Sequence, residues 1–274
     1  MKKFTDLLVF ELNRFKYFYI LLIGLITALQ VLTIFIVKNN YLWYLENFQK
    51  NNQGNIIDFL EVWGPISFVK VTDHTGYMFS IFLGIMALVI YAFAIWYRDW
   101  LGKNNLSYRL LTLPGSRLSI FFAKLATIIF MMFGLLALQL VYMYLGDELL
   151  RLLIPTELYV ETSIASYITM NPLLLLILPL TILDFILHYS IGIAVLFTVT
   201  MFILLELSYK IKGIIMSLAI IAGGLLISYL IVVNRVMDYL FSEEILLFVL
   251  LLSLIISGIA TFISHKLLEE KVTV

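Results

Sequence analysis

The chain has 274 residues, of which 62% are hydrophobic and only 13% are charged, and its formal net charge at pH 7 is zero. Soluble domains carry about 25% charged residues. A chain with a mean hydropathy of +1.03 is therefore excluded from the soluble class and is expected to be an integral membrane protein with no nucleic-acid partner.

Residues 1–16, at the start of the chain, favour an amphipathic helix before the first apolar run. Phe4, Leu8, Leu12 and Phe15 line one side of this helix. Such a pattern is typical of a helix that lies in the membrane interface. The alternative is a cytoplasmic extension of the first membrane span.

Six apolar runs predict an all-α membrane protein with six transmembrane helices in a single domain, 1–274. A helix that crosses a bilayer needs about 20 predominantly apolar residues. Pro172 and Pro179 interrupt the start of the fourth run, so we begin its span after them. The predicted spans are 17–37, 76–97, 118–145, 180–205, 214–233 and 245–264.

Lysine and arginine are unevenly distributed between the segments that connect these spans. If the N-terminus is cytoplasmic, the inner segments carry 13 of the 18 basic residues and the outer segments carry 5. Basic residues concentrate on the cytoplasmic side of membrane proteins. Both termini are therefore expected in the cytoplasm of a multi-pass protein.

Two outer segments, 38–75 and 147–170, are long enough to fold. The first contains an aromatic stripe at helical spacing, made by Tyr41, Tyr44, Leu45 and Phe48. We interpret the stripe as an aromatic belt at the outer interface, with a ligand site as the alternative. The second segment is acidic and is expected to be a solvated loop, although it could attract a cationic substrate.

Between the second and third spans, residues 104–113 predict a short cytoplasmic helix. Leu106, Leu110 and Leu113 recur at i, i+4 and i+7 and so share one side of it. Pro114 and Gly115 should end the helix, because proline lacks a backbone donor and glycine permits a positive φ. The result is a polar segment with one apolar ridge, which is suited to docking.

The sequence contains no catalytic, cofactor-binding or metal-binding motif. Cysteine is absent, the three histidines are far apart, and no Walker A loop occurs. We therefore expect a protein that is not itself an enzyme. Any energy for transport must come from a partner or from an ion gradient.

The fourth predicted span contains two polar residues, Asp184 and His188, one helical turn apart. Ionisable residues inside a membrane usually face a partner, water or protein. The pair is a candidate for the polar lining of a translocation path. Alternatively, Asp184 lies near the outer headgroups as an ordinary interfacial residue.

The region around the short cytoplasmic helix resembles the permease subunit of ABC-2 type transporters. The resemblance rests on the Arg98-Asp99 pair after the second span, the leucine-rich turn, the run Leu113-Pro114-Gly115-Ser116-Arg117, and Lys124 downstream. The six-span arrangement with cytoplasmic ends is also similar to that family over essentially the whole chain.

This resemblance implies that residues 104–113 form a coupling helix that docks on a separate ATP-binding cassette ATPase, which binds ATP and Mg. The docking residues would be Leu106, Tyr108, Arg109, Leu110, Leu113 and Arg117. Either arginine could instead contact phospholipid headgroups. The permease would pair with a second copy or a sister permease to enclose a path.

The resemblance implies that the protein is part of an ATP-driven exporter of peptides, drugs or other amphipathic substrates. The exporter would lie in a bacterial cell membrane and would serve antimicrobial peptide resistance or peptide export. The alternative is an ion-gradient-driven carrier or channel that uses Asp184 and His188. No internal repeat supports the alternative, although inverted-repeat carriers require one.

Overall fold

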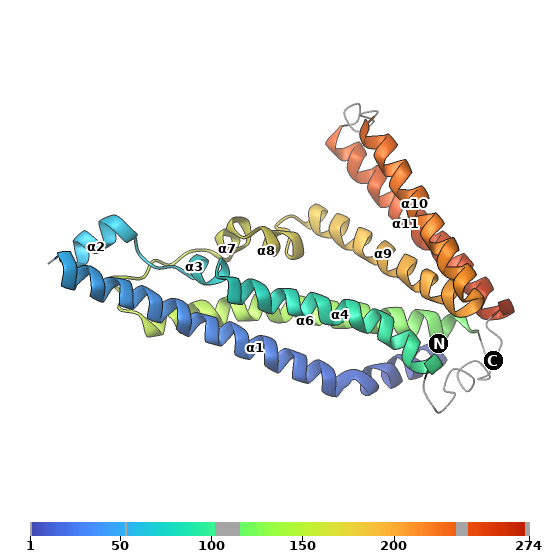
Figure 1. Ribbon diagram of the computed structural model, residues 1–274, viewed down its shortest axis with the longest axis horizontal. Helices are drawn as coiled ribbons and strands as arrows, with labels where there is room; N and C mark the ends of the chain where they lie inside the picture. Colours follow the sequence, from blue (N-terminus) through green and yellow to red (C-terminus); the bar gives the residue numbers. More distant parts are fainter. Residues whose placement is uncertain (1, 53, 102–115, 234–240, 272–274) are drawn as a thin grey trace. The chain divides into compact units, whose positions relative to one another are not determined.

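The computed structural model describes residues 2–52, 54–101, 116–233 and 241–271, and its regular elements within these ranges are all helices (Figure 1). An isolated parallel bridge joins Ile66 to Tyr159. The elements are α1 (Lys2–Asn52), α2 (Ile56–Trp63), α3 (Phe68–Thr72), α4 (Thr75–Leu101), α6 (Leu118–Leu153), α7 (Ile164–Met170), α8 (Pro172–Ile177), α9 (Ile182–Tyr209), α10 (Ile211–Val233), α11 (Ser242–Lys266) and the π-helix η2 (Leu267–Lys271).

Five helices are long and apolar enough to cross a membrane: α1, α4, α6, α9 and α11. The all-helical, multi-pass character predicted from the sequence is confirmed at this level. The fifth predicted span, 214–233, falls on α10, whose apolar stretch is the shorter Ile211–Ile227. A sixth span therefore stays a prediction.

Two helix boundaries bear on the sequence predictions. The proposed interfacial helix 1–16 and the first span are not separate, because α1 runs unbroken from Lys2 to Asn52. Its 51 residues are about 75 Å long at 1.5 Å per residue, well beyond a hydrocarbon core of about 30 Å. Pro172 opens α8, and the chain leaves helical geometry around Pro179 before α9 starts, as the two prolines predict.

The chain divides into two compact units, and α1, α4 and α6 contribute residues to both. Unit 1 comprises Met1–Arg14, Val89–Phe130 and Leu183–Val274, and unit 2 comprises Phe15–Leu88 and Met131–Ile182.

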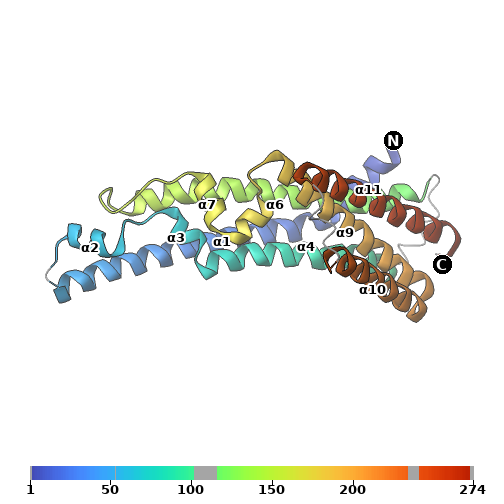
Figure 2. The same ribbon diagram turned by 90° about the horizontal axis from the view of Figure 1, so that it is seen from above.

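Unit 2 has a large apolar core in which the aromatic stripe of α1 takes part. Tyr41 is buried, its ring meets Phe59 of α2 edge-on at 5.4 Å, and its hydroxyl donates to the Gly64 carbonyl at 2.8 Å. α2 lies beside the end of α1 in both views (Figures 1 and 2). Gly64 ends α2 with a φ of 66°, which glycine adopts without steric cost. Tyr41 therefore packs in this core and does not face lipid headgroups.

The segment 147–170 is part of unit 2 and contributes to its apolar core. α7 packs against α3 and α8, and the buried ring of Tyr167 meets Phe68 edge-on at 5.2 Å. Tyr159 donates to the Asp147 carboxylate at 2.6 Å. Burial, and then this carboxylate, raise the pKa of Tyr159. At least one acid of this segment is thus hydrogen-bonded within the protein.

Unit 1 brings the first turns of α1 against the first turns of α6. Leu7 is buried against Ile120 and Ala123. In the same turns of α6, Phe121 meets Phe197 of α9 edge-on at 5.7 Å. These apolar contacts fix the register in which the charged residues of α1 and α6 meet.

The connection between α9 and α10 is a tight helical hairpin in unit 1. Lys210 has a φ of 53°, which lets the chain reverse between Tyr209 and Ile211. Gly213 lies so close to α9 that a Cβ atom there would overlap the Leu205 carbonyl oxygen. The absence of a side chain at residue 213 is what permits this close approach.

Candidate functional site

Five charged side chains from three helices of unit 1 form a mostly buried group that we call the ionic cluster. Its members are Glu11 and Arg14 of α1, Arg98 and Asp99 of α4, and Lys124 of α6. Both carboxylate side chains are 3% exposed, and that of Lys124 is 2% exposed. Charged groups are seldom buried to this degree unless they are paired.

Lys124 lies at the centre of the cluster and joins all three helices. Its ammonium group donates to Glu11 at 3.0 Å, to Asp99, and to the backbone carbonyl of Ile95 at 2.8 Å. An ammonium group has three protons, so its donor capacity is filled. The Nζ atom also lies 5.2 Å from the centroid of the Trp96 ring, a favourable place for a cation.

The two arginines complete the coordination of the carboxylates. Arg98 donates to Oε2 of Glu11 at 2.9 Å, and Arg14 donates to Oδ1 of Asp99 at 2.8 Å. Arg14 also lies 3.6 Å from Oε2 of Glu11. Each carboxylate thus bridges a lysine and an arginine, which offsets the cost of removing it from water.

Local sequence explains why each residue reaches the cluster. Glu11 and Arg14 are three residues apart and so share a face of α1. Arg98 and Asp99 are in the last turn of α4, and Lys124 is in the second turn of α6, on the buried side with Phe121 and Leu125. With every donor of Lys124 occupied, the arrangement suits rigid connection of helices better than proton transfer.

The cluster lies close in sequence to both ends of residues 102–115. Asp99 is three residues before this segment, and Lys124 is nine residues after it. The predicted docking residues Leu106, Tyr108, Arg109, Leu110 and Leu113 fall in the segment, outside the described residues. Their role stays a prediction.

Arg117, the remaining predicted docking residue, contacts the other end of the chain. It begins the turn that leads into α6 and donates to the backbone carbonyl of Leu268 and, at 3.3 Å, to that of Glu269. Leu267 and Leu268 are buried. The guanidinium group therefore joins the start of α6 to two carbonyl groups of η2, the π-helix that directly follows α11; cations are favourable near such helix C-termini.

Asp184 and His188 lie on the first two turns of α9, as their spacing predicts. Asp184 is exposed, and Nδ1 of His188 donates to the backbone carbonyl of Asp184 at 2.8 Å. An acid in the first turn of a helix is stabilised by the helix dipole. A part in translocation stays a prediction for both residues.

A second polar group, in unit 2, links α1, α4 and α6 through neutral side chains. Gln30 donates to Ser80 at 3.2 Å and to Gln139 at 2.9 Å, and Gln139 donates to the Tyr77 hydroxyl at 2.7 Å. All four residues are buried. In an apolar bundle such hydrogen bonds hold helices together.

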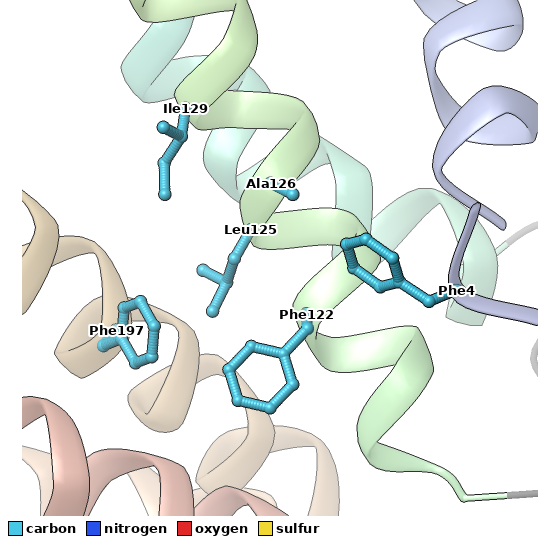
Figure 3. A pocket seen from close by; sticks show the side chains of 6 residues that line it. All are labelled: Phe4, Phe122, Leu125, Ala126, Ile129 and Phe197. Carbon is cyan, nitrogen blue, oxygen red and sulfur yellow. The ribbon is translucent and has the colours of Figure 1, made fainter. Parts of the chain in front are cut away.

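An apolar pocket of about 340 Å³ lies in unit 1 on the side of α6 that faces α9 (Figure 3). Its walls come from the start of α1, from α6 and from α9. They are formed by Phe4, Phe122, Leu125, Ala126, Ile129 and Phe197. The lining contains no charged side chain.

The sequence did not predict the ionic cluster as a group. The sequence singled out Arg98, Asp99 and Lys124 only through a family resemblance, and it gave no reason to single out Glu11 and Arg14. The available signal was the position of all five charges at or near the ends of apolar runs. Arg98 is 87 residues and Lys124 is 113 residues from Glu11 in the sequence. No local spacing therefore reveals their pairing.

Comparisons with family models, with curated proteins and with solved structures gave no match. The functional interpretation therefore rests on the residues and their arrangement.

Proposed function

We propose that the chain is the membrane-spanning permease subunit of an ATP-binding cassette exporter of the ABC-2 type. In this proposal a separate ATPase subunit binds ATP and Mg, docks on residues 104–113, and drives export of a peptide, drug or other amphipathic substrate. A second copy or a sister permease completes the path, and the location is a bacterial plasma membrane.

The observation that carries the proposal is the ionic cluster at the two ends of the predicted docking segment. A partner that pushes on a segment moves the membrane helices at its two ends together only if those helices are rigidly connected to each other. Lys124 donates to both Asp99 and Glu11, so it joins the end of α4 to α1 and α6. Force applied to 102–115 would therefore act on α1, α4 and α6 together.

Arg117 supports the same interpretation from the opposite end of the chain. Its contacts with Leu268 and Glu269 connect the end of the proposed docking segment to α11. Five helices of membrane-spanning length supply the body of a permease. The bias of basic residues toward the inner segments supports a cytoplasmic position for 102–115.

The docking role is tested by Leu110→Asp in the tagged, full-length chain expressed in its native host. The change puts a charge on the ridge proposed to be buried against the ATPase. Loss of a central interface contact costs about 2 kcal/mol or more, a decrease of roughly thirty-fold in affinity. We expect the variant to insert normally into the membrane. The ATPase partner, recognised by its Walker A lysine, should no longer co-purify with it, and the ATP hydrolysis of the preparation should be lost.

Thr112→Asp is the matched control, because Thr112 falls elsewhere on the helix circumference and receives the same charge. It should retain the ATPase. Equal retention by both variants, or the absence of any ATP-hydrolysing partner in the unmodified preparation, would overturn the proposal. Transport in energised vesicles that lack ATP would favour the ion-driven alternative.

A further inference from the structure

The ionic cluster has more positive than negative charge. It contains three cations, Arg14, Arg98 and Lys124, and two carboxylates, Glu11 and Asp99. Lys124 is buried with its donors filled, so the surplus charge belongs to the two arginines. An additional anion beside them would balance the cluster.

The arginines are also the part of the cluster that an outside molecule can reach. The side chain of Arg98 is 33% exposed and that of Arg14 is 24% exposed, against 2 to 3% for the other three members. Both guanidinium groups approach the same oxygen, Oε2 of Glu11, at 2.9 and 3.6 Å. They are therefore close enough to each other to share one ligand.

Their place along the helices matches the depth of lipid headgroups. Arg98 follows the apolar run 76–97 of α4, and Arg14 precedes the apolar run 17–37 of α1. Basic residues at the ends of membrane-spanning helices extend their charged groups to the interface. The anion most abundant at that depth is the phosphate of a phospholipid, and guanidinium groups match its oxygens in pairs.

We propose that Arg14 and Arg98 bind the phosphate of one anionic phospholipid between α1 and α4. Lys124 and the two carboxylates hold the arginines in place from the buried side. The bound lipid neutralises the surplus charge and thereby stabilises the cluster. The proposal is independent of transport and of an ATPase partner.

The test uses the purified full-length chain in vesicles of phosphatidylcholine alone and of an equimolar mixture with phosphatidylglycerol. Native mass spectrometry measures which lipid stays bound, and thermal unfolding measures stability in each vesicle. The unmodified chain should retain phosphatidylglycerol preferentially and unfold at a higher temperature in the mixture. Arg98→Gln should lower the preference about five-fold, since a basic residue near an anionic surface contributes about 1 kcal/mol.

Lys16→Gln is the matched control, because Lys16 is an exposed cation of α1 outside the cluster. It should keep most of the preference. An equal loss in both variants would mean diffuse attraction to the membrane and would refute a site. The site is also refuted if Arg98→Gln lowers the unfolding temperature equally in both vesicles, or if inorganic phosphate stabilises the phosphatidylcholine sample as much as phosphatidylglycerol does.

Discussion

Glu11→Gln removes a charge that three cations share. Glu11 lies 3.0 Å from Lys124, 2.9 Å from Arg98 and 3.6 Å from Arg14, and its side chain is 3% exposed. At an effective dielectric constant of 20, each attraction is about 5 kcal/mol, offset by several kcal/mol for removing each ion from water. Loss of one partner in such a group costs about 3–5 kcal/mol.

Lys124→Met should cost less, although Lys124 makes as many contacts as Glu11. Its removal leaves two arginines and two carboxylates, which balance in charge, whereas Glu11→Gln leaves three cations with one carboxylate. The remaining cost is that of two carboxylate oxygens that lose a donor, about 1–3 kcal/mol. The double variant restores the original surplus of one positive charge and should cost less than the two single changes together, by about 0.5–3 kcal/mol.

Detergent titrations in mixed micelles measure the free energy of unfolding of each variant. Circular dichroism and tryptophan fluorescence follow the unfolding. Trp96, next to Lys124, supplies a local signal. Glu46→Gln is the control, because Glu46 is 68% exposed and its ion pair with Lys50 is 3.9 Å long. It should change stability by less than about 0.5 kcal/mol. If Lys124→Met proves as destabilising as Glu11→Gln, or the two changes are additive, the charge-balance reasoning is wrong.

Two further predictions concern the hairpin and the topology. Gly213→Ala should lower the unfolding temperature, because the added Cβ meets the Leu205 carbonyl, whereas Gly192→Ala, with open space around it, should raise helix stability by about 0.5–1 kcal/mol. Because the chain has no cysteine, single cysteines report accessibility: in intact cells, Thr156→Cys should react with a membrane-impermeant maleimide and Lys210→Cys should not. Labelling of Lys210→Cys but not of Thr156→Cys would show that the chain has the opposite orientation to the one predicted.

The sequence by itself determined the class of the protein and most helix positions. Apolar runs must leave water and must satisfy their backbone within the membrane, so their length and composition are sufficient to predict helices. The break around Pro179 followed from proline chemistry. The sequence offered the unbroken course of α1 only as an alternative, because Glu11, Arg14 and Lys16 interrupt the apolar residues before the run 17–37.

Tertiary structure alone decided what the charges at these helix ends do. The approach of α1 to α6 depends on the packing of Leu7 on Ile120, and it brings Glu11 to Lys124 across 113 residues of sequence. Similarly, the burial of Tyr41 required α2 to fold back beside α1. Hydropathy and spacing are properties of one helix, whereas the pairing of buried charges depends on the relative positions of several, so only the packed helices could show the ionic cluster.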